Sequence, residues 1–218
     1  MTRPGAPLPS LMGRAVARAL LTGPQATEAD ARIFEATIAV LARRGTREAT
    51  MDDVAAESGV SRATLFRRFS GKDELFERAL TREIGLLLAG LAQRFEVITD
   101  PTEQVIEGFL DCMRLNDHIL FKTTDPERRT DLVDALCHGD PSPIALVHYA
   151  VRSNIAKNQA AGKIPPGLPD LQADALIHIC IGYLAAPSVA IDLTDPDAVR
   201  TLARVAIAPI LTGATVAQ

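Results

Sequence analysis

Residues 50–72, TMDDVAAESGVSRATLFRRFSGK, decide the fold of this chain. The stretch predicts two short helices joined by a tight turn at Gly59, because glycine adopts left-handed backbone conformations at little cost. No acidic residue lies between Ser61 and Lys72, whereas the preceding helix is acidic. A short basic helix held at an angle by another helix has a shape that suits the major groove of DNA. The stretch therefore favours binding and regulation over catalysis.

Hydroxyl side chains begin both of these predicted helices. Thr50 is a typical N-cap, and Asp53 three residues later forms a weak capping box with it. Ser61 caps the second helix. In that helix Leu65 and Phe69 lie four residues apart, so they share one face and are expected to anchor it in the core. The positions then left outward are Arg62, Thr64 and Arg68.

The rest of the chain also predicts helices. Apolar residues make up 47% of the 218 residues, aromatic residues only 4%, and Trp is absent, which favours packed helices over a β-sandwich. Apolar spacing and Pro or Gly punctuation predict an all-α fold. The expected helices span residues 27–45, 50–59, 61–69, 71–97, 101–121, 126–138, 143–161, 169–190 and 195–211.

Charge is unevenly distributed along the sequence. The net charge of −4 alone argues against a nucleic-acid partner. However, residues 1–27 carry three arginines and no acid, whereas the chain from residue 81 onward carries 17 acids and 11 bases. A cationic end and an acidic remainder suit a protein that touches phosphate at one end only.

Three scattered cysteines form no disulfide framework and fit a reducing compartment. No apolar run approaches the roughly 18 residues that a membrane span needs, and we identify no signal peptide. The sequence thus predicts a cytoplasmic protein with no membrane partner.

The sequence contains no ligand spacing of a zinc site, no phosphate-binding loop and no hydrolase motif. We therefore expect no metal, no cofactor and no enzymatic activity.

Residues 31–80, ARIFEATIAVLARRGTREATMDDVAAESGVSRATLFRRFSGKDELFERAL, resemble the DNA-binding domain of the TetR family of repressors. The register holds without gaps over nearly fifty residues. The matching positions are Gly45, Thr50, Val54, Ala55, Gly59, Val60, Ser61, Thr64, Leu65, Phe69, Lys72 and Leu75. The remainder of the chain matches only in length and helical content, as the family's variable ligand-binding domains do.

This resemblance implies a DNA interface on the helix-turn-helix. Near the start of the second helix, Arg62 is placed to present a bidentate fork to guanine. Arg67, Arg68 and Lys72 are better placed as phosphate contacts. The full predicted set is Thr50, Ser61, Arg62, Ala63, Thr64, Phe66, Arg67, Arg68 and Lys72.

The sequence departs from the family pattern at Ala63, where Gly is common, at Phe66, where Tyr is usual, and at Arg68, where His or Tyr is usual. Phe66 has no hydroxyl to donate to a phosphate. For each arginine, the alternative to a DNA contact is a position on an ordinary solvent-exposed helix face.

Three regions follow from these patterns. They are a flexible basic N-terminal arm (1–26), a helix-turn-helix DNA-binding domain (27–72) and a ligand-binding and dimerisation domain (73–218). The arm has Pro and Gly at both ends, with room for a short helix between Leu11 and Leu21, and it is either a disordered tail or a segment that lies along DNA. The last two helices are apolar on more than one side, which predicts a homodimer formed through them.

Polar groups scattered on apolar faces of the middle helices predict a small-molecule site. The candidate lining residues are Phe109, Met113, Asn116, His118, Tyr149 and Arg152. Ordinary core packing is the alternative for the apolar ones.

The chain is thus expected to be a repressor that binds a palindromic double-stranded DNA operator as a dimer and is released by a small-molecule effector. Two alternatives stay open: a ligand-independent architectural DNA-binding protein, and an all-α enzyme or binding module with a vestigial helix-turn-helix.

Overall fold

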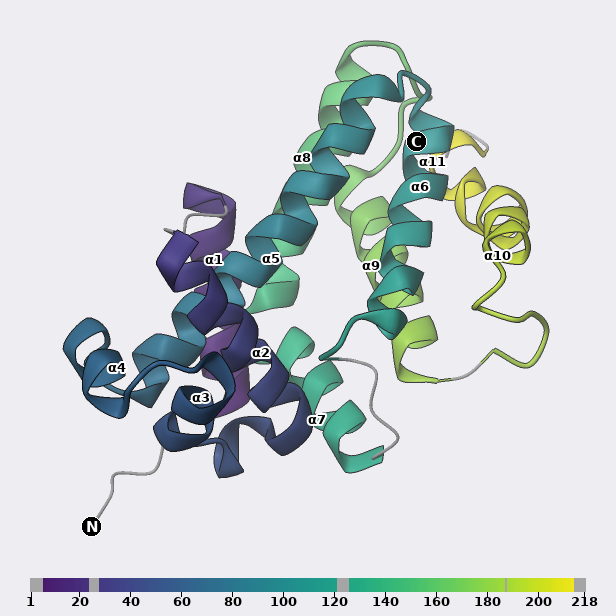
Figure 1. The fold of residues 1–218 in the computed structure, drawn as a ribbon. Coiled ribbons are helices and arrows are strands. Elements are labelled where there is room, and N and C mark those ends of the chain that lie inside the picture. Colours follow the sequence, from purple (N-terminus) through teal and green to yellow (C-terminus); the bar gives the residue numbers. More distant parts are fainter. Residues whose placement is uncertain (1–5, 24–27, 121–125, 187, 214–218) are drawn as a thin grey trace. The chain divides into compact units, whose positions relative to one another are not determined.

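The computed structural model of the chain describes residues 6–23, 28–120, 126–186 and 188–213. These residues form helices and no strand, which confirms the predicted all-α fold (Figure 1). None of the described helices is both long and apolar enough to cross a membrane. The helices are α1 (Leu8–Thr22), α2 (Glu28–Glu48), α3 (Met51–Ser58), α4 (Arg62–Arg68), α5 (Lys72–Val97), α6 (Pro101–Arg114), α7 (Pro126–Cys137), α8 (Pro143–Ala160), α9 (Pro169–Ala185), α10 (Pro196–Leu202) and α11 (Pro209–Thr212).

Three predicted helices end earlier or are interrupted. The helix predicted over 101–121 ends at Arg114 and tightens into a 3₁₀ turn, Leu115–Asp117. The helix predicted over 169–190 ends at Ala185, because the residue that precedes Pro187 is disfavoured in the helical region, and Ala186 is extended. The last helix is divided by a π turn, Ala203–Ile207, before Pro209, which has no amide hydrogen for the helix ladder.

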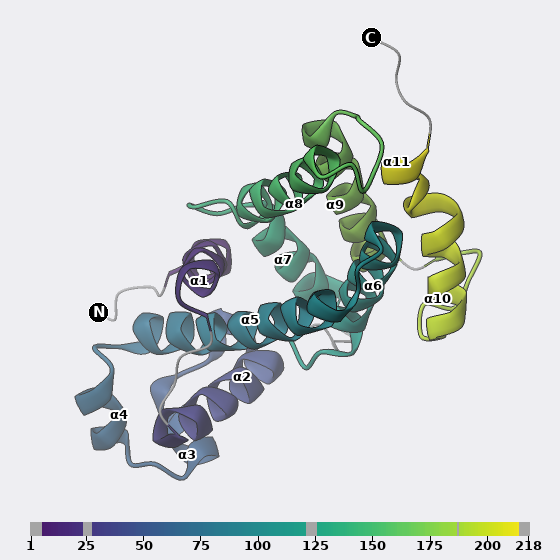
Figure 2. The ribbon, with the colours of Figure 1, turned by 90° about the horizontal axis from the view of Figure 1, so that it is seen from above.

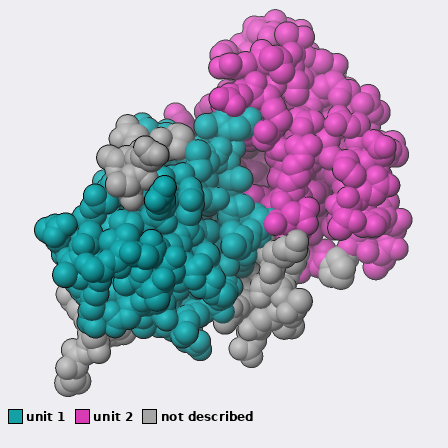
Figure 3. Space-filling model, viewed as in Figure 1, with its two compact units in different colours: residues 1–90, 118–143 teal, residues 91–117, 144–218 magenta. Residues whose placement is uncertain are grey.

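The described residues pack into two compact units, coloured separately in Figure 3. Unit 1 comprises residues 1–90 and 118–143, and unit 2 comprises residues 91–117 and 144–218. Helix α5 begins in unit 1 and continues into unit 2. The functional boundaries expected at residues 26 and 72 stay predictions, because these units are defined by packing alone.

The core of unit 1 joins the helix-turn-helix to the start of α5. Phe34 of α2 and Phe69 after α4 are buried, with ring centroids 5.9 Å apart. The guanidinium of Arg78 on α5 lies 5.0 Å from the Phe69 ring centroid and 5.6 Å from that of Phe34. An arginine over two aromatic faces contributes both cation–π attraction and packing of its aliphatic stem. This cluster fixes α4 against α2 and α5.

Helix α1 corrects the prediction of a flexible arm for residues 8–22. Its buried face includes Leu11, Ala15 and Ala19, and it packs against α7. In Figure 2 it lies on the opposite side of α5 from α2, α3 and α4. Arg14 Nε also donates to Glu77 Oε2 of α5 at 2.6 Å. The apolar stripe explains the difference, because a helix with such a stripe is stabilised by burying it. Residues 1–5 and 24–27, with the predicted N-cap Thr27, lie outside the described residues.

Helix α6 is the centre of unit 2 and contacts α9, α10 and the π turn. Its acidic residues pair with Arg114 of α6 itself and with arginines from neighbouring segments of the unit. The pairs are Arg94–Asp111 (2.6 Å), Arg114–Asp111 (2.6 Å), Arg114–Glu107 (3.0 Å), Arg200–Glu107 (3.5 Å) and Arg204–Glu103 (2.9 Å). A separate apolar cluster of Ile155, Ile164, Ala173 and Leu211 ties α8, α9 and α11 together. Ion pairs thus stabilise α6 within unit 2, and apolar packing joins α8, α9 and α11.

Candidate nucleic-acid interface

The helix-turn-helix has the local geometry that its sequence predicts. Thr50 Oγ1 accepts from the Asp53 amide at 3.1 Å, and Asp53 Oδ2 accepts from the Thr50 amide at 2.9 Å, which completes the capping box. Gly59 has φ 69° and ψ 14°, the left-handed conformation that favours glycine. Ser61 Oγ accepts from the Thr64 amide at 3.2 Å and caps α4. These contacts set the angle between α3 and α4.

Helix α4 displays one set of side chains to solvent and buries another. Leu65 and Phe69 are buried, as predicted. Exposed positions on the helix are Arg62, Ala63, Phe66, Arg67 and Arg68, and Thr64 is half-buried. We call Arg62, Ala63, Phe66 and Arg67 the reading surface. It is a cationic surface with an aromatic ring in its middle, and its contacts with DNA stay a prediction.

Arg62 is held in place by neighbours on both sides. Its Nη1 lies 2.8 Å from Asp52 Oδ2 on α3, and its guanidinium lies 5.3 Å from the ring centroid of Phe66. Phe66 exposes 46% of its surface, so its ring is available to an apolar group such as a thymine methyl. The sequence did not identify Asp52 as a partner, although an acid in the first turn of α3 complements the helix dipole there.

Arg68 forms an ion pair within the protein, whereas the sequence predicted a contact with DNA. Its Nη1 lies 3.0 Å from Asp30 Oδ1 of α2, and the same carboxylate is 4.0 Å from Arg78. To bind phosphate, this guanidinium must therefore leave an internal partner. No sequence pattern predicts this pair, because the two residues are 38 positions apart.

Lys72 is half-buried and fastens the connection between α2 and α3. Its Nζ donates to the carbonyl oxygens of Thr46, at 3.2 Å, and Ala49, at 3.4 Å, and lies 5.8 Å from the Phe76 ring centroid. This structural role was missed by sequence reasoning. A cation at the positive end of a helix is unfavourable, so Lys72 at the start of α5 was a signal that a specific partner offsets that cost.

Arg67 is the cation of α4 with no ion pair or hydrogen bond among the described residues. Around it, the segment 27–72 is nearly balanced, with eight basic and seven acidic residues. Several of these acids are stabilised as anions. A hydrogen bond from Thr50 lowers the pKa of Asp53, and a hydrogen bond from Arg43 lowers the pKa of Glu57. The domain therefore offers a focused cationic surface rather than a broad basic patch.

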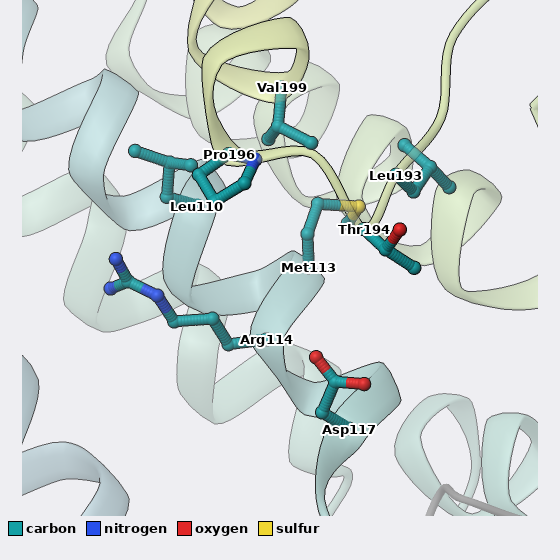
Figure 4. Close-up of a pocket in the computed structure, with 8 residues that line it drawn as sticks. All are labelled: Leu110, Met113, Arg114, Asp117, Leu193, Thr194, Pro196 and Val199. Atoms are coloured by element: carbon teal, nitrogen blue, oxygen red, sulfur yellow. The ribbon is translucent and has the colours of Figure 1, made fainter.

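A small pocket lies in unit 2 between α6 and the segment that leads into α10. Its volume is about 60 Å³, far below the roughly 300–1,000 Å³ of typical small-molecule sites. Figure 4 shows Leu110 and Met113 of α6 facing Leu193, Thr194, Pro196 and Val199. Arg114 and Asp117 complete the lining. Arg114 and Asp117 are polar residues three positions apart at the end of an amphipathic helix. This spacing is the sequence signal that could have identified them as pocket residues.

The six predicted ligand residues are not brought together by the structure. Met113 lines the pocket, and Phe109 is buried edge-on against Tyr183, with centroids 5.6 Å apart. Tyr149 exposes 69% of its surface, and Arg152 Nε pairs with Asp170 at 2.7 Å. Asn116 lies in the 3₁₀ turn, and His118 belongs to unit 1. Of the six, only Met113 lines the pocket of about 60 Å³, so a ligand role for the set stays a prediction.

His118 instead makes a structural pair in unit 1. The Leu120 amide donates to His118 Nδ1 at 3.3 Å, so in the neutral ring Nε2 carries the hydrogen and donates to Glu83 Oε1 at 2.7 Å. This hydrogen bond lowers the pKa of Glu83, against the opposing effect of burial. The pair ties the segment after α6 to the middle of α5.

Replacing Glu83 with Gln is expected to destabilise the protein by about 1 kcal/mol near neutral pH. Because the pKa of Glu83 is lower in the folded state, its contribution is present above its unfolded pKa of about 4.3 and is lost as the pH falls through the folded value. Thermal melts of both proteins across pH 3–7 measure this. The difference in Tm should close below about pH 4; a difference that stays constant over this range contradicts the assignment.

No group of His, Cys, Asp and Glu within the described ranges has an arrangement that could hold a metal ion.

Comparison with known proteins bears on the helix-turn-helix most directly. Residues 33–79 match the family described as bacterial regulatory proteins, tetR family. The transcriptional activator FasR of Mycolicibacterium smegmatis is 35% identical over 75 residues, which cover 33% of this chain and 34% of FasR. The transcriptional repressor SCO4008 of Streptomyces coelicolor is 36% identical over 95 residues, covering 44% and 43% of the two chains. The chain thus spans less than half the length of these curated relatives.

The fold is similar to that of several solved structures over most of the chain. The fatty acid degradation regulator FadR of Bacillus halodurans has a TM-score of 0.58 at 16% identity, covering 82% of this chain and 96% of FadR. FadR of Bacillus subtilis, solved with stearoyl-CoA, has a TM-score of 0.57 at 15% identity, covering 84% and 98%. The ketosteroid regulator KstR2 of Mycobacterium tuberculosis has a TM-score of 0.55 at 16% identity, covering 88% and 99%. At such identities the likeness shows the fold alone.

Proposed function

Because the chain belongs to the TetR family of bacterial regulatory proteins, we propose that it is a ligand-responsive transcriptional repressor. The observation that carries the proposal is the reading surface. Arg62, Ala63, Phe66 and Arg67 are exposed on a helix whose other side is anchored by the buried Leu65 and Phe69. A rigidly held helix with exposed guanidinium groups is suited to the major groove. The relatives found are named as transcriptional regulators, which supports binding over catalysis.

The apolar surface of the last helices supports a homodimer. Helix α9 is apolar around most of its circumference, yet Leu171 on it remains 64% exposed, and Val205 in the π turn remains 72% exposed. We infer that a second copy covers these residues, since a helix that is apolar on all sides is normally buried. A two-fold dimer would present two α4 helices about 34–36 Å apart to the half-sites of a palindromic operator.

The effector is proposed to be a small, largely apolar molecule that enters unit 2. Two structural relatives are described as a regulator in complex with stearoyl-CoA and as a ketosteroid regulator, which motivates apolar probes. The pocket of about 60 Å³ between α6 and the segment before α10 is too small for such a molecule, so the proposal requires this pocket to enlarge on binding. The effector releases the DNA only if it binds the DNA-incompetent state more tightly.

Replacing Arg67 with Ala is expected to weaken binding to all DNA sequences and to reduce the slope of log K against log salt by about 2, because each protomer of the dimer loses one phosphate contact. Gel-shift titrations at several salt concentrations measure this, with Arg43→Ala as the matched control. Arg43 lies on α2, outside the reading surface, and pairs with Glu57 of α3. Equal slopes for the intact protein and Arg67→Ala would place Arg67 outside the interface.

A ligand-independent DNA-binding protein is the second candidate, and the small volume of the pocket favours it. The two candidates differ in their response to effector probes. Stearoyl-CoA and a steroid, added separately to the protein–DNA complex, should release the DNA and shift the Tm of the free protein if the first proposal holds. DNA binding that neither probe nor a wider metabolite panel changes supports the second candidate. Failure to bind any specific fragment at moderate salt refutes both.

A further inference from the structure

The pairing of Arg62 distinguishes it from the other two arginines of α4. Its Nη1 donates to Asp52 Oδ2 of α3 at 2.8 Å, and both side chains stay mostly exposed, at 64% and 59%. Arg68 pairs instead with Asp30, a carboxylate with only 16% of its side chain exposed. Arg67 has no ion pair among the described residues. Helix α4 therefore presents to solvent one bare cation, Arg67, and one cation, Arg62, that is accompanied by an exposed anion.

The contact with Asp52 leaves one edge of the Arg62 guanidinium free. Arginine carries five N–H donors on Nε, Nη1 and Nη2, and the contact uses Nη1. On the other edge the Nε–H and one Nη2–H point the same way, as the O6 and N7 acceptors of guanine require. The Phe66 ring centroid, 5.3 Å from the guanidinium, supports the group from its face. Asp52 and Phe66 thus restrict this side chain while the edge suited to guanine stays open.

Asp52 also determines which kind of acceptor Arg62 favours. A guanidinium 2.8 Å from a carboxylate forms a pair with almost no net charge, so its attraction to DNA phosphates is largely cancelled. The remaining N–H groups can still donate to neutral acceptors on a base edge. The pair therefore favours bases over the backbone, whereas the bare cation of Arg67 favours phosphate.

An ordinary surface ion pair is the alternative. Exposed pairs contribute little to stability, and Asp52 would then act only on the dipole of α3, whose first turn it occupies. Two observations favour a role in DNA binding. The partner of Asp52 is the first residue of α4, where recognition helices contact base edges. In addition, Phe66 holds the same guanidinium from a second direction.

We propose that Asp52 is a positioning residue that determines the specificity of the DNA interface, an inference that rests on the function proposed above. Its carboxylate holds the Arg62 guanidinium with the free edge available to guanine and cancels the charge that would otherwise bind phosphate. Specificity is the difference between the free energies of binding to operator and to random DNA. Without Asp52, Arg62 is mobile and cationic, so it binds phosphates on any sequence and this difference shrinks.

The test compares Asp52→Ala with the intact protein on the selected operator, on variants of the base pair that Arg62 reads, and on random DNA. Discrimination between the operator and these variants should fall about threefold to tenfold. Affinity for random DNA should rise, and the slope of log K against log salt should steepen by about 2, because the freed Arg62 of each protomer gains one phosphate contact. Tm should change by less than about 3 °C, because Asp52 and its partner are exposed.

Glu57→Ala is the matched control. It removes the same charge from the same helix and also breaks an ion pair, that with Arg43, but it leaves Arg62 and its contacts in place. This variant should keep full discrimination. In an Arg62→Ala background, Asp52→Ala should cause no further loss of discrimination at this base pair and no steeper salt slope, because the residue that it positions is absent.

The outcomes distinguish this inference from the proposed function. An intact protein that selects no sequence refutes the proposed function and this inference together. Where an operator is selected, the inference alone is overturned if Asp52→Ala keeps full discrimination, or if it changes the affinities for operator and random DNA by the same factor. It is also overturned if Glu57→Ala loses as much discrimination, or if Asp52→Ala unfolds the protein, which would make Asp52 a structural residue.

Discussion

Replacing Phe69 with Ala is expected to lower the free energy of unfolding by about 3–5 kcal/mol and to abolish sequence-specific DNA binding. Phe69 is 1% exposed and sits between the Phe34 ring and the Arg78 guanidinium. Removing it leaves a cavity where α4 is attached to α2 and α5, and α4 is too short to remain helical without that attachment. Chemical denaturation monitored by circular dichroism measures the loss of stability, and gel shifts measure the loss of binding.

Phe66→Ala is the matched control for this change. The two phenylalanines lie three residues apart, but Phe66 is 46% exposed. Its removal should change the free energy of unfolding by less than about 0.5 kcal/mol while weakening binding to specific DNA, because the reading surface loses its aromatic ring and Arg62 loses a stacking partner. If Phe66→Ala destabilises the protein as much as Phe69→Ala, the orientation of α4 described here is wrong.

Replacing Gly13 with Ala is expected to destabilise the protein by about 1–3 kcal/mol, the reverse of the usual effect in a helix. In most helices this substitution stabilises by about 0.5–1 kcal/mol. At Gly13, however, an added Cβ would lie 2.1 Å from the carbonyl oxygen of Pro141. That atom belongs to the backbone and cannot rotate away, so α1 must move off the segment between α7 and α8. Thermal and chemical denaturation measure the effect.

Gly108→Ala supplies the control in a comparable helical position. An added Cβ there would meet the Phe95 ring at 3.5 Å, which is ordinary van der Waals contact. This variant should be as stable as the intact protein or slightly more stable. If Gly13→Ala also gains stability, then α1 does not pack closely on residues 140–143, and the flexible arm predicted from the sequence would describe residues 8–22 better.

The helix-turn-helix was predictable because its determinants are local. The capping box of Thr50 and Asp53, the left-handed Gly59 and the Ser61 cap each depend on residues within a few positions of one another. The four-residue spacing of Leu65 and Phe69 was enough to orient α4. Helix ends were less predictable where a 3₁₀ or π turn depends on how the backbone packs, as after Arg114 and Leu202.

The remaining features depend on contacts that are distant in sequence. The docking of α1 was missed because its partner, α7, lies more than 100 residues away. Lys72 was assigned to a phosphate contact from its place just after the basic helix, whereas its hydrogen bonds to Thr46 and Ala49 form only when α2 packs against α5. The pocket-lining residues after α9 have no sequence pattern that pairs them with α6.

The most direct test of the account is base-pair discrimination by Arg62. Selection from random DNA with the intact protein should first yield a palindromic operator. Competition titrations of Arg62→Ala on that operator and on single base-pair variants should then show a loss of about 1–3 kcal/mol, confined to one base pair in each half-site, with unchanged affinity for random DNA. If Arg62→Ala instead weakens operator and random DNA alike, or if selection enriches no sequence, α4 does not read DNA in the way proposed here.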